Sequence, residues 1–216
     1  MIITAVLFDL DGTLLDTAPD LLAAMNLTLA AYQRPMMNTI DLRQSIAYGT
    51  DTMLSVAFNM DPSDCMFNSI KEQFLANYQQ CLGTYTKLFE GMDLVLNYLD
   101  SHAIPWGIVT NKLTRFTVPL LQTLHLKQRA GCLVTGDTLS YIKPHPEPLW
   151  YGCQLLGSHP NETLYIGDYQ VDVDAAKAAH MPSLIITNYY HRPDENPHDW
   201  QADFVVTHAE QLLQFL

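Results

Sequence analysis

The sequence that decides the fold runs from residue 5 to residue 17 and is Ala5-Val6-Leu7-Phe8-Asp9-Leu10-Asp11-Gly12-Thr13-Leu14-Leu15-Asp16-Thr17. Its first four residues are apolar, which predicts a strand that is buried on both faces. Asp9 and Asp11 follow, two positions apart, so in an extended chain their carboxylates point to the same side. Gly12 then permits a tight turn.

Two carboxylates at the end of a buried strand are costly unless a cation lies between them. One interpretation is therefore a metal-assisted site, in which one carboxylate is a nucleophile and the other moves a proton. The alternative is a strand that runs into an ordinary Asp-Gly turn.

The composition is that of a folded, acidic protein. The 216 residues are 48% hydrophobic and 16% charged, so a sizeable core can form and disorder is not expected. The formal net charge is -12, which argues against nucleic acid or an anionic membrane as a partner because phosphate groups would be repelled. If the substrate is an anion, the positive charge that attracts it has to be local.

The cysteines indicate a reducing compartment. Four are present, and none forms a Cys-x-x-Cys pair or a zinc-like spacing, so free thiols are expected. The chain begins directly with a strand, without a basic and apolar leader, and no apolar run is long enough to span a bilayer. We therefore expect a cytoplasmic protein. The sequence leaves open whether it is a monomer or a homodimer.

Apolar residues recur at helical spacing throughout residues 17–82, and no convincing strand pattern interrupts them. The helices predicted there cover residues 19–34, 39–47, 51–58 and 62–80. This segment therefore predicts a small helical bundle that is inserted directly after the first strand.

From residue 83 onward, strand patterns and helix patterns alternate. Strands are predicted at residues 104–109, 132–135, 163–166, 184–187 and 204–206. Helices are predicted at residues 92–101, 114–124, 147–156, 171–180 and 209–215, and a polar surface loop at 188–203. Such alternation is typical of βαβ units and predicts an α/β fold, with a parallel sheet that carries helices on both faces.

Polar residues follow three of the predicted strands. They are Asp9 and Asp11, then Thr110 and Asn111, and then Gly167, Asp168 and Asp172. In an open parallel sheet, ligands bind outside the carboxyl ends of the strands, so we expect these groups to face one crevice.

Each of these groups has a chemical use. Asp9 and Asp168 offer the hard oxygen ligands that Mg²⁺ takes. Thr110 and the backbone N–H of Asn111 can hold phosphoryl oxygens. Lys143 lies in a loop stiffened by prolines and can neutralise charge on a nucleophile and on a transferring group. The alternative for Lys143 is a solvated surface position.

Together these residues resemble the four signatures of the haloacid dehalogenase-like phosphatase superfamily. The signatures are Asp9-Leu10-Asp11-Gly12-Thr13, Thr110-Asn111, Lys143-Pro144, and Gly167-Asp168 with Asp172, and they occur in the right order over nearly the whole chain. Finer matches resemble the phosphoglycolate phosphatase-like branch, and these are Leu15-Asp16-Thr17-Ala18-Pro19-Asp20-Leu21, Val109-Thr110-Asn111-Lys112 and Lys143-Pro144-His145-Pro146-Glu147-Pro148-Leu149. The resemblance implies a Rossmann-like core at residues 1–16 and 83–216, with a small α-helical cap domain at residues 17–82.

The resemblance also implies a role for each site residue. Asp9 would attack phosphorus and form an aspartyl-phosphate, and Asp11 would first donate and then accept a proton. Mg²⁺ would be held by the carboxylates of Asp9 and Asp168 and by the backbone carbonyl of Asp11. Asp172 would stand beside this metal site or act as an occasional ligand. The phosphoryl group would be bound by Thr110, Asn111 and Lys143.

Two places depart from the pattern of the branch. Tyr169 follows Asp168 where a small residue is usual, so its ring would either crowd the metal side or point toward the cap. The cap loop at residues 43–50 keeps one of two usual glycines. Within this loop Arg43 can reach a substrate carboxylate, or else lie on the helix surface, and Tyr48 can reach a sugar or an amide.

We therefore expect an enzyme, namely a phosphoric monoester hydrolase that uses Mg²⁺ to hydrolyse a small phosphorylated metabolite. A phosphomutase on the same scaffold is the main alternative, and a non-catalytic binding protein is another. Asp11 argues against a dehalogenase, which lacks the second acid. A phosphonate hydrolase would need a cap lysine near the site, and the cap offers only Lys71, far along its last helix. Phosphoglycolate, a sugar phosphate, a muramic-acid-type phosphosugar and pyrophosphate all fit as substrates.

Overall fold

The computed structural model describes residues 2–187, 190, 192 and 194–216. Its main sheet has six strands in the order β5-β4-β1-β6-β7-β8, and each neighbouring pair is parallel. The strands are β1 (Ala5–Phe8), β4 (Trp106–Val109), β5 (Cys132–Val134), β6 (Thr163–Gly167), β7 (Ser183–Ile186) and β8 (Phe204–Val206). The predicted Rossmann-like parallel sheet is thus confirmed.

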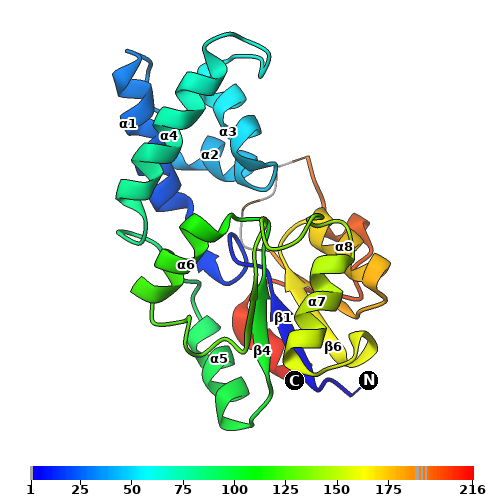
Figure 1. Cartoon of the computed structure of the whole chain (residues 1–216). Coiled ribbons are helices and arrows are strands. Elements are labelled where there is room, and N and C mark those ends of the chain that lie inside the picture. The colour runs from blue at the N-terminus through cyan, green and yellow to red at the C-terminus, as the bar shows by residue number, and fades with distance from the viewer. Residues whose placement is uncertain (1, 188–189, 191, 193) are drawn as a thin grey trace.

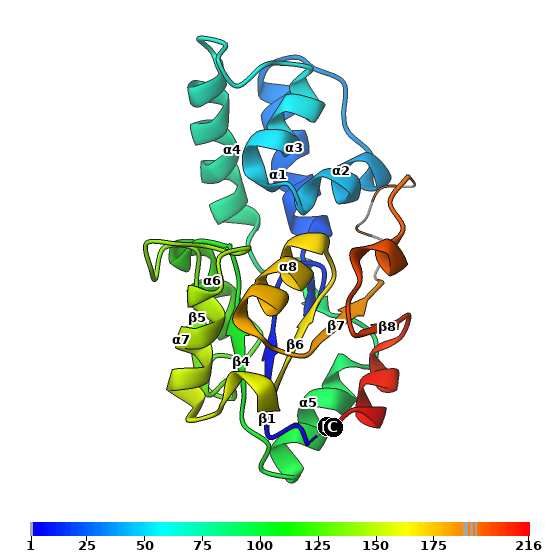
Figure 2. The same cartoon turned by 90° about the vertical axis from the view of Figure 1, so that its right-hand side faces the viewer.

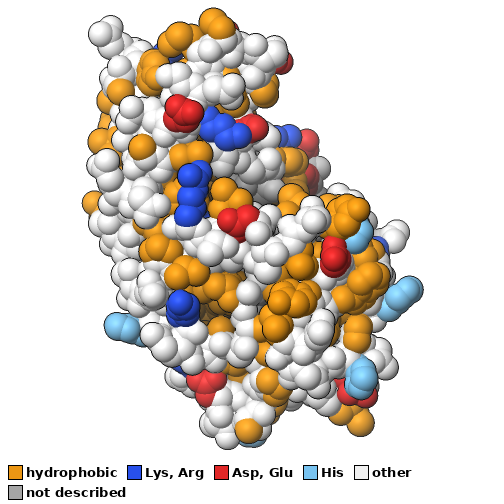
Figure 3. All heavy atoms as spheres, viewed as in Figure 1, with side chains coloured by type: hydrophobic (Ala, Val, Ile, Leu, Met, Phe, Trp, Pro, Cys, Tyr) orange, Lys and Arg blue, Asp and Glu red, His pale blue; other side chains and the backbone are white. Residues whose placement is uncertain are grey.

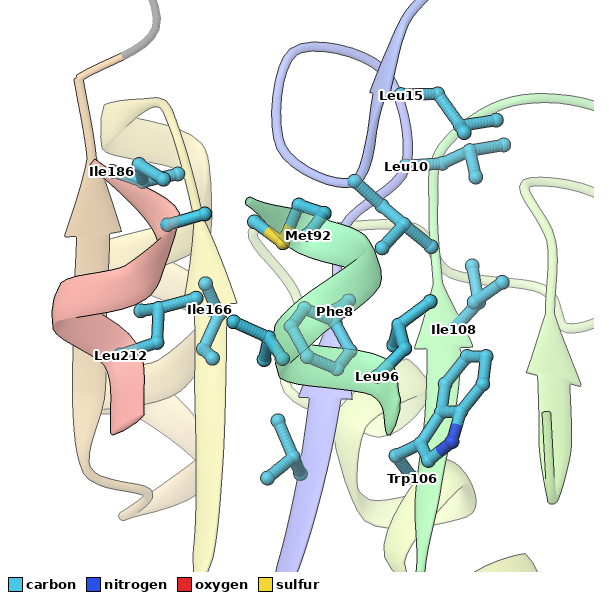
Figure 4. Packing of buried hydrophobic residues seen from close by; sticks show 14 of the residues in the cluster. Phe8, Leu10, Leu15, Met92, Leu96, Trp106, Ile108, Ile166, Ile186 and Leu212 are labelled. Atoms are coloured by element: carbon cyan, nitrogen blue, oxygen red, sulfur yellow. The ribbon is translucent and has the colours of Figure 1, made fainter. Parts of the chain in front are cut away.

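Strand β1 lies near the middle of the sheet because all four of its residues are apolar and fully buried. Its side chains alternate between the two faces, as the pleat requires. Val6 and Phe8 belong to a cluster with α5 (Met92–Ser101), α6 (Thr114–Thr123) and the 3₁₀ helix η3 (Ala209–Gln214). Figure 4 shows Met92, Leu96 and Leu212 packed over this face.

The opposite face of the sheet is covered by two other helices. Leu7 packs there with Val109 and Tyr165 against α7 (Glu147–Leu156) and α8 (Gln170–Ala179). Helices on both faces bury the whole length of the central strands. The polar ends of those strands are therefore the places where the sheet opens toward a ligand.

Four further helices form a group of their own, and they are α1 (Ala18–Ala31), α2 (Thr39–Ile46), α3 (Gly49–Phe58) and α4 (Phe67–Cys81). Figures 1 and 2 show this group above the carboxyl ends of the strands, and its buried side chains form a second cluster, which Phe116 and Tyr190 join from outside the four helices. The division into a core at 1–16 and 83–216 and a cap at 17–82 stays a prediction. No helix in the described part of the chain combines the length and apolarity that crossing a bilayer requires.

Several predicted boundaries differ from the structure. Helix α4 begins at Phe67, later than predicted, because Asp61 and Asp64 accept hydrogen bonds from the backbone N–H of Ser63 and Met66 and form local turns instead. The closing helix is the 3₁₀ helix η3. The pattern also missed the two-residue strands β2 (Leu15–Asp16) and β3 (Lys87–Leu88), which are too short to show a periodicity.

The predicted surface loop at residues 188–203 is partly buried, so that prediction was wrong for two of its aromatic residues. The ring of Tyr190 is buried, and its hydroxyl donates to Asp16 Oδ1 and accepts from the backbone N–H of Ala18, both at 2.8 Å. Trp200 is also buried, at the end of the short helix η2 (Pro197–Trp200). Residues 188, 189, 191 and 193 lie outside the described residues.

Asp20 ties the start of α1 to the segment that follows α4. It lies in the first turn of α1 and is fully buried. Its carboxylate accepts hydrogen bonds from the backbone N–H of Gly83 and of Tyr85, both at 2.7 Å, and from the hydroxyl of Thr86 at 2.5 Å. The segment that leaves the helical group is thereby tied to the segment that begins it.

We predict that Asp20→Ala lowers the free energy of unfolding by about 2–4 kcal/mol, because two backbone donors lose a charged acceptor. Urea-induced unfolding, followed by circular dichroism, measures this change. Asp174→Ala is the matched control, since Asp174 is exposed on α8 and its loss is expected to change stability by less than about 0.5 kcal/mol. Equal stability of the two variants would contradict the role given to Asp20.

Candidate active site

A cavity of about 530 Å³ lies between the helical group and the carboxyl ends of β1, β4 and β6. Figure 3 shows the face on which this hollow opens, with Lys and Arg side chains beside it. All but one of the predicted site residues line it, and these are Asp9, Asp11, Thr110, Asn111, Lys143, Asp168 and Asp172. Distant parts of the sequence are therefore brought to one place.

Lys143 lies deep in the cavity and is only 3% exposed. Its Nζ lies 2.7 Å from Asp172 Oδ1, 2.7 Å from the hydroxyl of Tyr165 and 2.8 Å from Asp9 Oδ1. The alternative of a solvated surface lysine is wrong. Asn111 fixes the backbone of this residue, because its side-chain amide donates to the carbonyl of Lys143 and accepts from its N–H, both at 3.0 Å.

Charge holds this lysine protonated. Burial alone would lower the pKa of Lys143, but the carboxylates of Asp172 and Asp9 more than offset that effect and hold the pKa above its usual value. The site thus contains a fixed positive charge next to Asp9, at the end of the central strand.

Three carboxylates nevertheless crowd together. Asp9, Asp168 and Asp172 each offer an oxygen within 4.8 Å of the others. Burial, aided by the charges of Asp172 and Asp11, raises the pKa of Asp9 from 3.8 to about 6 against the opposing effect of Lys143. Burial, aided by the charges of Asp172 and Asp9, holds the pKa of Asp168 well above its usual range. One ammonium group does not balance this negative charge.

The backbone is shaped to bring these carboxylates together. Gly12 has a φ of +89°, and a Cβ at this position would lie 2.2 Å from Asp168 Oδ2, so a side chain cannot be accommodated. Thr13 donates its hydroxyl to Asp168 Oδ1 at 2.8 Å. The turn after β1 therefore lies directly against the end of β6.

Asp172 has a different environment from the other two acids. Its Oδ1 accepts from Lys143 Nζ and from the hydroxyl of Tyr165, and its Oδ2 accepts from the backbone N–H of Asp168 and of Tyr169. By contrast, Asp9 Oδ1 is buried without a well-directed hydrogen bond, although Lys143 Nζ lies within 2.8 Å. Asp9 and Asp168 thus fit a divalent cation better than Asp172 does.

We predict that a divalent cation stabilises the protein more at about pH 7.5 than at about pH 5. Because the pKa of Asp9 is raised in the folded state, protonated Asp9 contributes to stability below about pH 3.8, and this contribution is lost as the pH rises through about 6. A cation relieves this cost only where the carboxylates are ionised. The measurement is the change in melting temperature on adding MgCl₂ at each pH, with NaCl of equal ionic strength as the control. An equal shift at both pH values would contradict the prediction.

Lys112 is a site residue that the sequence interpretation missed. Its Nζ lies 3.0 and 3.1 Å from the two carboxylate oxygens of Asp11, and 4.8 Å from the centre of the Tyr78 ring on α4. Burial would lower the pKa of Lys112, but Asp11 more than offsets this and holds it above its usual value. Its signal in the sequence was its place at the end of Val109-Thr110-Asn111-Lys112, one of the matches to the branch, although that match by itself assigns no role to the lysine.

Tyr169 points toward the helical group. Its hydroxyl is hydrogen-bonded to the hydroxyl of Tyr48 and to the carboxylate of Glu195, and its ring meets that of Tyr48 edge to face at 5.3 Å. Of the two orientations expected for this ring, the structure shows the one toward the cap. Tyr48 and Tyr169 together form one wall of the cavity.

Two basic residues of the helical group, Arg43 and Lys71, differ from the sequence-based expectation in whether they line the cavity. Arg43 binds Asp16 Oδ2 at 2.8 Å and lies over the ring of Tyr190, and it is not among the residues that line the cavity. Lys71 does line the cavity, paired with Asp51 at 2.6 Å, so the expectation that it lies far from the site was wrong.

Comparison with known proteins agrees with this geometry. A family model described as haloacid dehalogenase-like hydrolase matches residues 6–186. An N-acetylmuramic acid 6-phosphate phosphatase of Pseudomonas putida is 38% identical over 216 residues, covering 100% of this chain and 97% of the relative. A phosphoglycolate phosphatase of Xanthomonas campestris pv. campestris is 40% identical over 211 residues, covering 97% of this chain and 95% of the relative.

A solved structure is also similar. It is a protein of Haemophilus somnus described as a predicted phosphoglycolate phosphatase, with a TM-score of 0.87, 26% identity and coverage of 99% of this chain and 97% of that one. The resemblance to the phosphoglycolate phosphatase-like branch is confirmed. With a family model that spans most of the chain and relatives that span nearly all of it, this protein belongs to the haloacid dehalogenase-like hydrolase family.

Proposed function

We propose that this protein is a Mg²⁺-dependent phosphatase that hydrolyses a small phosphorylated metabolite through an aspartyl-phosphate. The observation that carries the proposal is the placement of Asp9. This carboxylate stands at the end of the central strand, 2.8 Å from the buried ammonium of Lys143 and close to Asp168. A nucleophilic carboxylate needs such surroundings, because positive charge must attract a phosphoryl group toward it.

In this mechanism, a carboxylate oxygen of Asp9 attacks phosphorus while the bond from phosphorus to the ester oxygen breaks. Asp11 donates a proton to the leaving oxygen and then accepts one from the water that hydrolyses the aspartyl-phosphate. Lys143, with Thr110 and Asn111, binds the phosphoryl oxygens. Lys112 holds the carboxylate of Asp11 in place from the side.

Mg²⁺, held by the carboxylates of Asp9 and Asp168 and the backbone carbonyl of Asp11, would neutralise charge on the transferring group. We assign Asp172 to positioning, although it was a candidate ligand. Both of its oxygens already accept hydrogen bonds, from Lys143 and Tyr165 on one side and from the backbone on the other.

We also propose that residues 17–82 act as a cap over a core formed by residues 1–16 and 83–216. The second hydrophobic cluster, which consists mainly of residues of the four helices, supports this division. So does the cavity, to which the helical group contributes Tyr48, Lys71 and Tyr78. The cap would then supply the contacts that select the part of the substrate beyond the phosphoryl group.

A panel of phosphorylated metabolites tests the proposed reaction. We expect inorganic phosphate to be released in the presence of Mg²⁺ and not after treatment with EDTA, with recovery when Mg²⁺ is restored. The panel should contain phosphoglycolate, N-acetylmuramic acid 6-phosphate, hexose phosphates and pyrophosphate. Formation of an isomeric phosphate without phosphate release would favour a phosphomutase instead.

We predict that Asp9→Asn lowers kcat by a factor of about 10³ or more, since the amide is a poor nucleophile. The fold should persist, because the substitution removes a carboxylate whose ionisation burial opposes. Steady-state kinetics and the melting temperature measure the two effects. Asp174→Asn, on the exposed face of α8, serves as the control and should keep wild-type activity. Wild-type-like turnover in Asp9→Asn would overturn the mechanism.

A further inference from the structure

Four basic side chains line the cavity, and three of them are paired with carboxylates. Lys143 is bound to Asp9 and Asp172, Lys112 to Asp11, and Lys71 to Asp51. Arg115 is the fourth, and no carboxylate in the described part of the chain forms an ion pair with it. It is thus the lining cation whose charge is available to a ligand.

Arg115 is also held at a suitable place. It lies in the first turn of α6, is exposed to solvent, and its guanidinium carbon lies 4.7 Å from the centre of the neighbouring Phe116 ring. Phe116 is buried and lines the cavity as well. Its ring supports the flat face of the guanidinium and leaves the N–H groups at the edge free to bind an anion.

Part of the cavity wall is apolar. It includes Leu21, Met53, Leu75 and Phe116, which face the same hollow as the acidic cluster. Cavities of roughly 300–1,000 Å³ hold ligands much larger than a two-carbon acid. The volume of about 530 Å³ and the apolar wall therefore suit a substrate with a bulky, partly apolar body.

The acidic end of the cavity imposes a second condition. At this end of the cavity, Lys143 is paired with Asp9 and Asp172, and Lys112 with Asp11, so neither lysine is left for a substrate carboxylate close to the phosphorus. A carboxylate several bonds away does not depend on these two lysines. It can then lie against the unpaired guanidinium, whose planar fork binds carboxylates through two parallel hydrogen bonds.

We propose that Arg115 forms a distal anion subsite, which selects phosphate monoesters that carry a carboxylate remote from the phosphoryl group, as a sugar-acid phosphate does. The inference rests on the proposed phosphatase function and deepens it by naming the substrate class. Arg115 is then a specificity-determining residue that α6 contributes to the cavity.

Two matched esters test this subsite. N-acetylmuramic acid 6-phosphate and N-acetylglucosamine 6-phosphate differ only in the lactyl ether that carries the carboxylate. We expect the wild-type protein to prefer the acid, and Arg115→Gln to lower the ratio of the two kcat/KM values by about 10-fold to 100-fold, mainly through KM for the acid. Arg115→Lys should keep part of the preference, because lysine carries the positive charge but lacks the planar guanidinium that forms two parallel hydrogen bonds.

Arg34→Gln is the matched control, since Arg34 is an exposed arginine that does not line the cavity. This variant should keep the wild-type ratio. Three results would overturn the subsite even though phosphatase activity remains. They are a wild-type ratio near one, a ratio that does not change in Arg115→Gln, and a preference for phosphoglycolate over both sugar phosphates. Failure of the wild-type protein to release phosphate from any ester would instead overturn the proposed function, and the subsite with it.

Discussion

The arrangement of this protein depends on one buried ammonium group, that of Lys143. A lysine with 3% exposure is stable only if carboxylates compensate for the lost water. Asp9, directly after β1, and Asp172, in the first turn of α8, do so. This requirement links the loop before α7 to the end of β1 and to α8. Asn111, after β4, completes the connection by binding the backbone of the lysine on both sides.

The same centre holds more negative than positive charge, and this imbalance explains its chemical character. Burial first, and neighbouring carboxylates second, raise the pKa values of Asp9 and Asp168, so the fold holds these two carboxylates there at a cost to stability. Cores that serve only packing avoid such clusters, whereas sites that bind cations and transfer charged groups require them. Gly12 makes the crowding possible, because only a residue without a Cβ fits against Asp168.

Contacts between the helical group and the sheet control what surrounds this centre. The hydroxyl of Tyr48 is hydrogen-bonded to Tyr169 and Glu195. Arg43 forms an ion pair with Asp16, just before the chain enters α1. Lys112 adds a third contact, because it pairs with Asp11 while it lies over the ring of Tyr78 on α4. Asp11 and the helical group therefore share one basic neighbour.

The sequence by itself determined the alternation of strands and helices and the polar residues at the strand ends, because periodicity and strand length are properties of neighbouring residues. Only the tertiary structure decided the strand order, the pairing of Lys112 with Asp11 across 101 positions, the position of Lys71 in the cavity and the engagement of Arg43 by Asp16. These contacts join residues far apart in the chain, and a charged side chain has the same local pattern whether it is solvated or paired. The same holds for the basic residues of the cavity, because the pairing of Lys112, Lys143 and Lys71 with carboxylates depends on contacts between residues far apart in the chain.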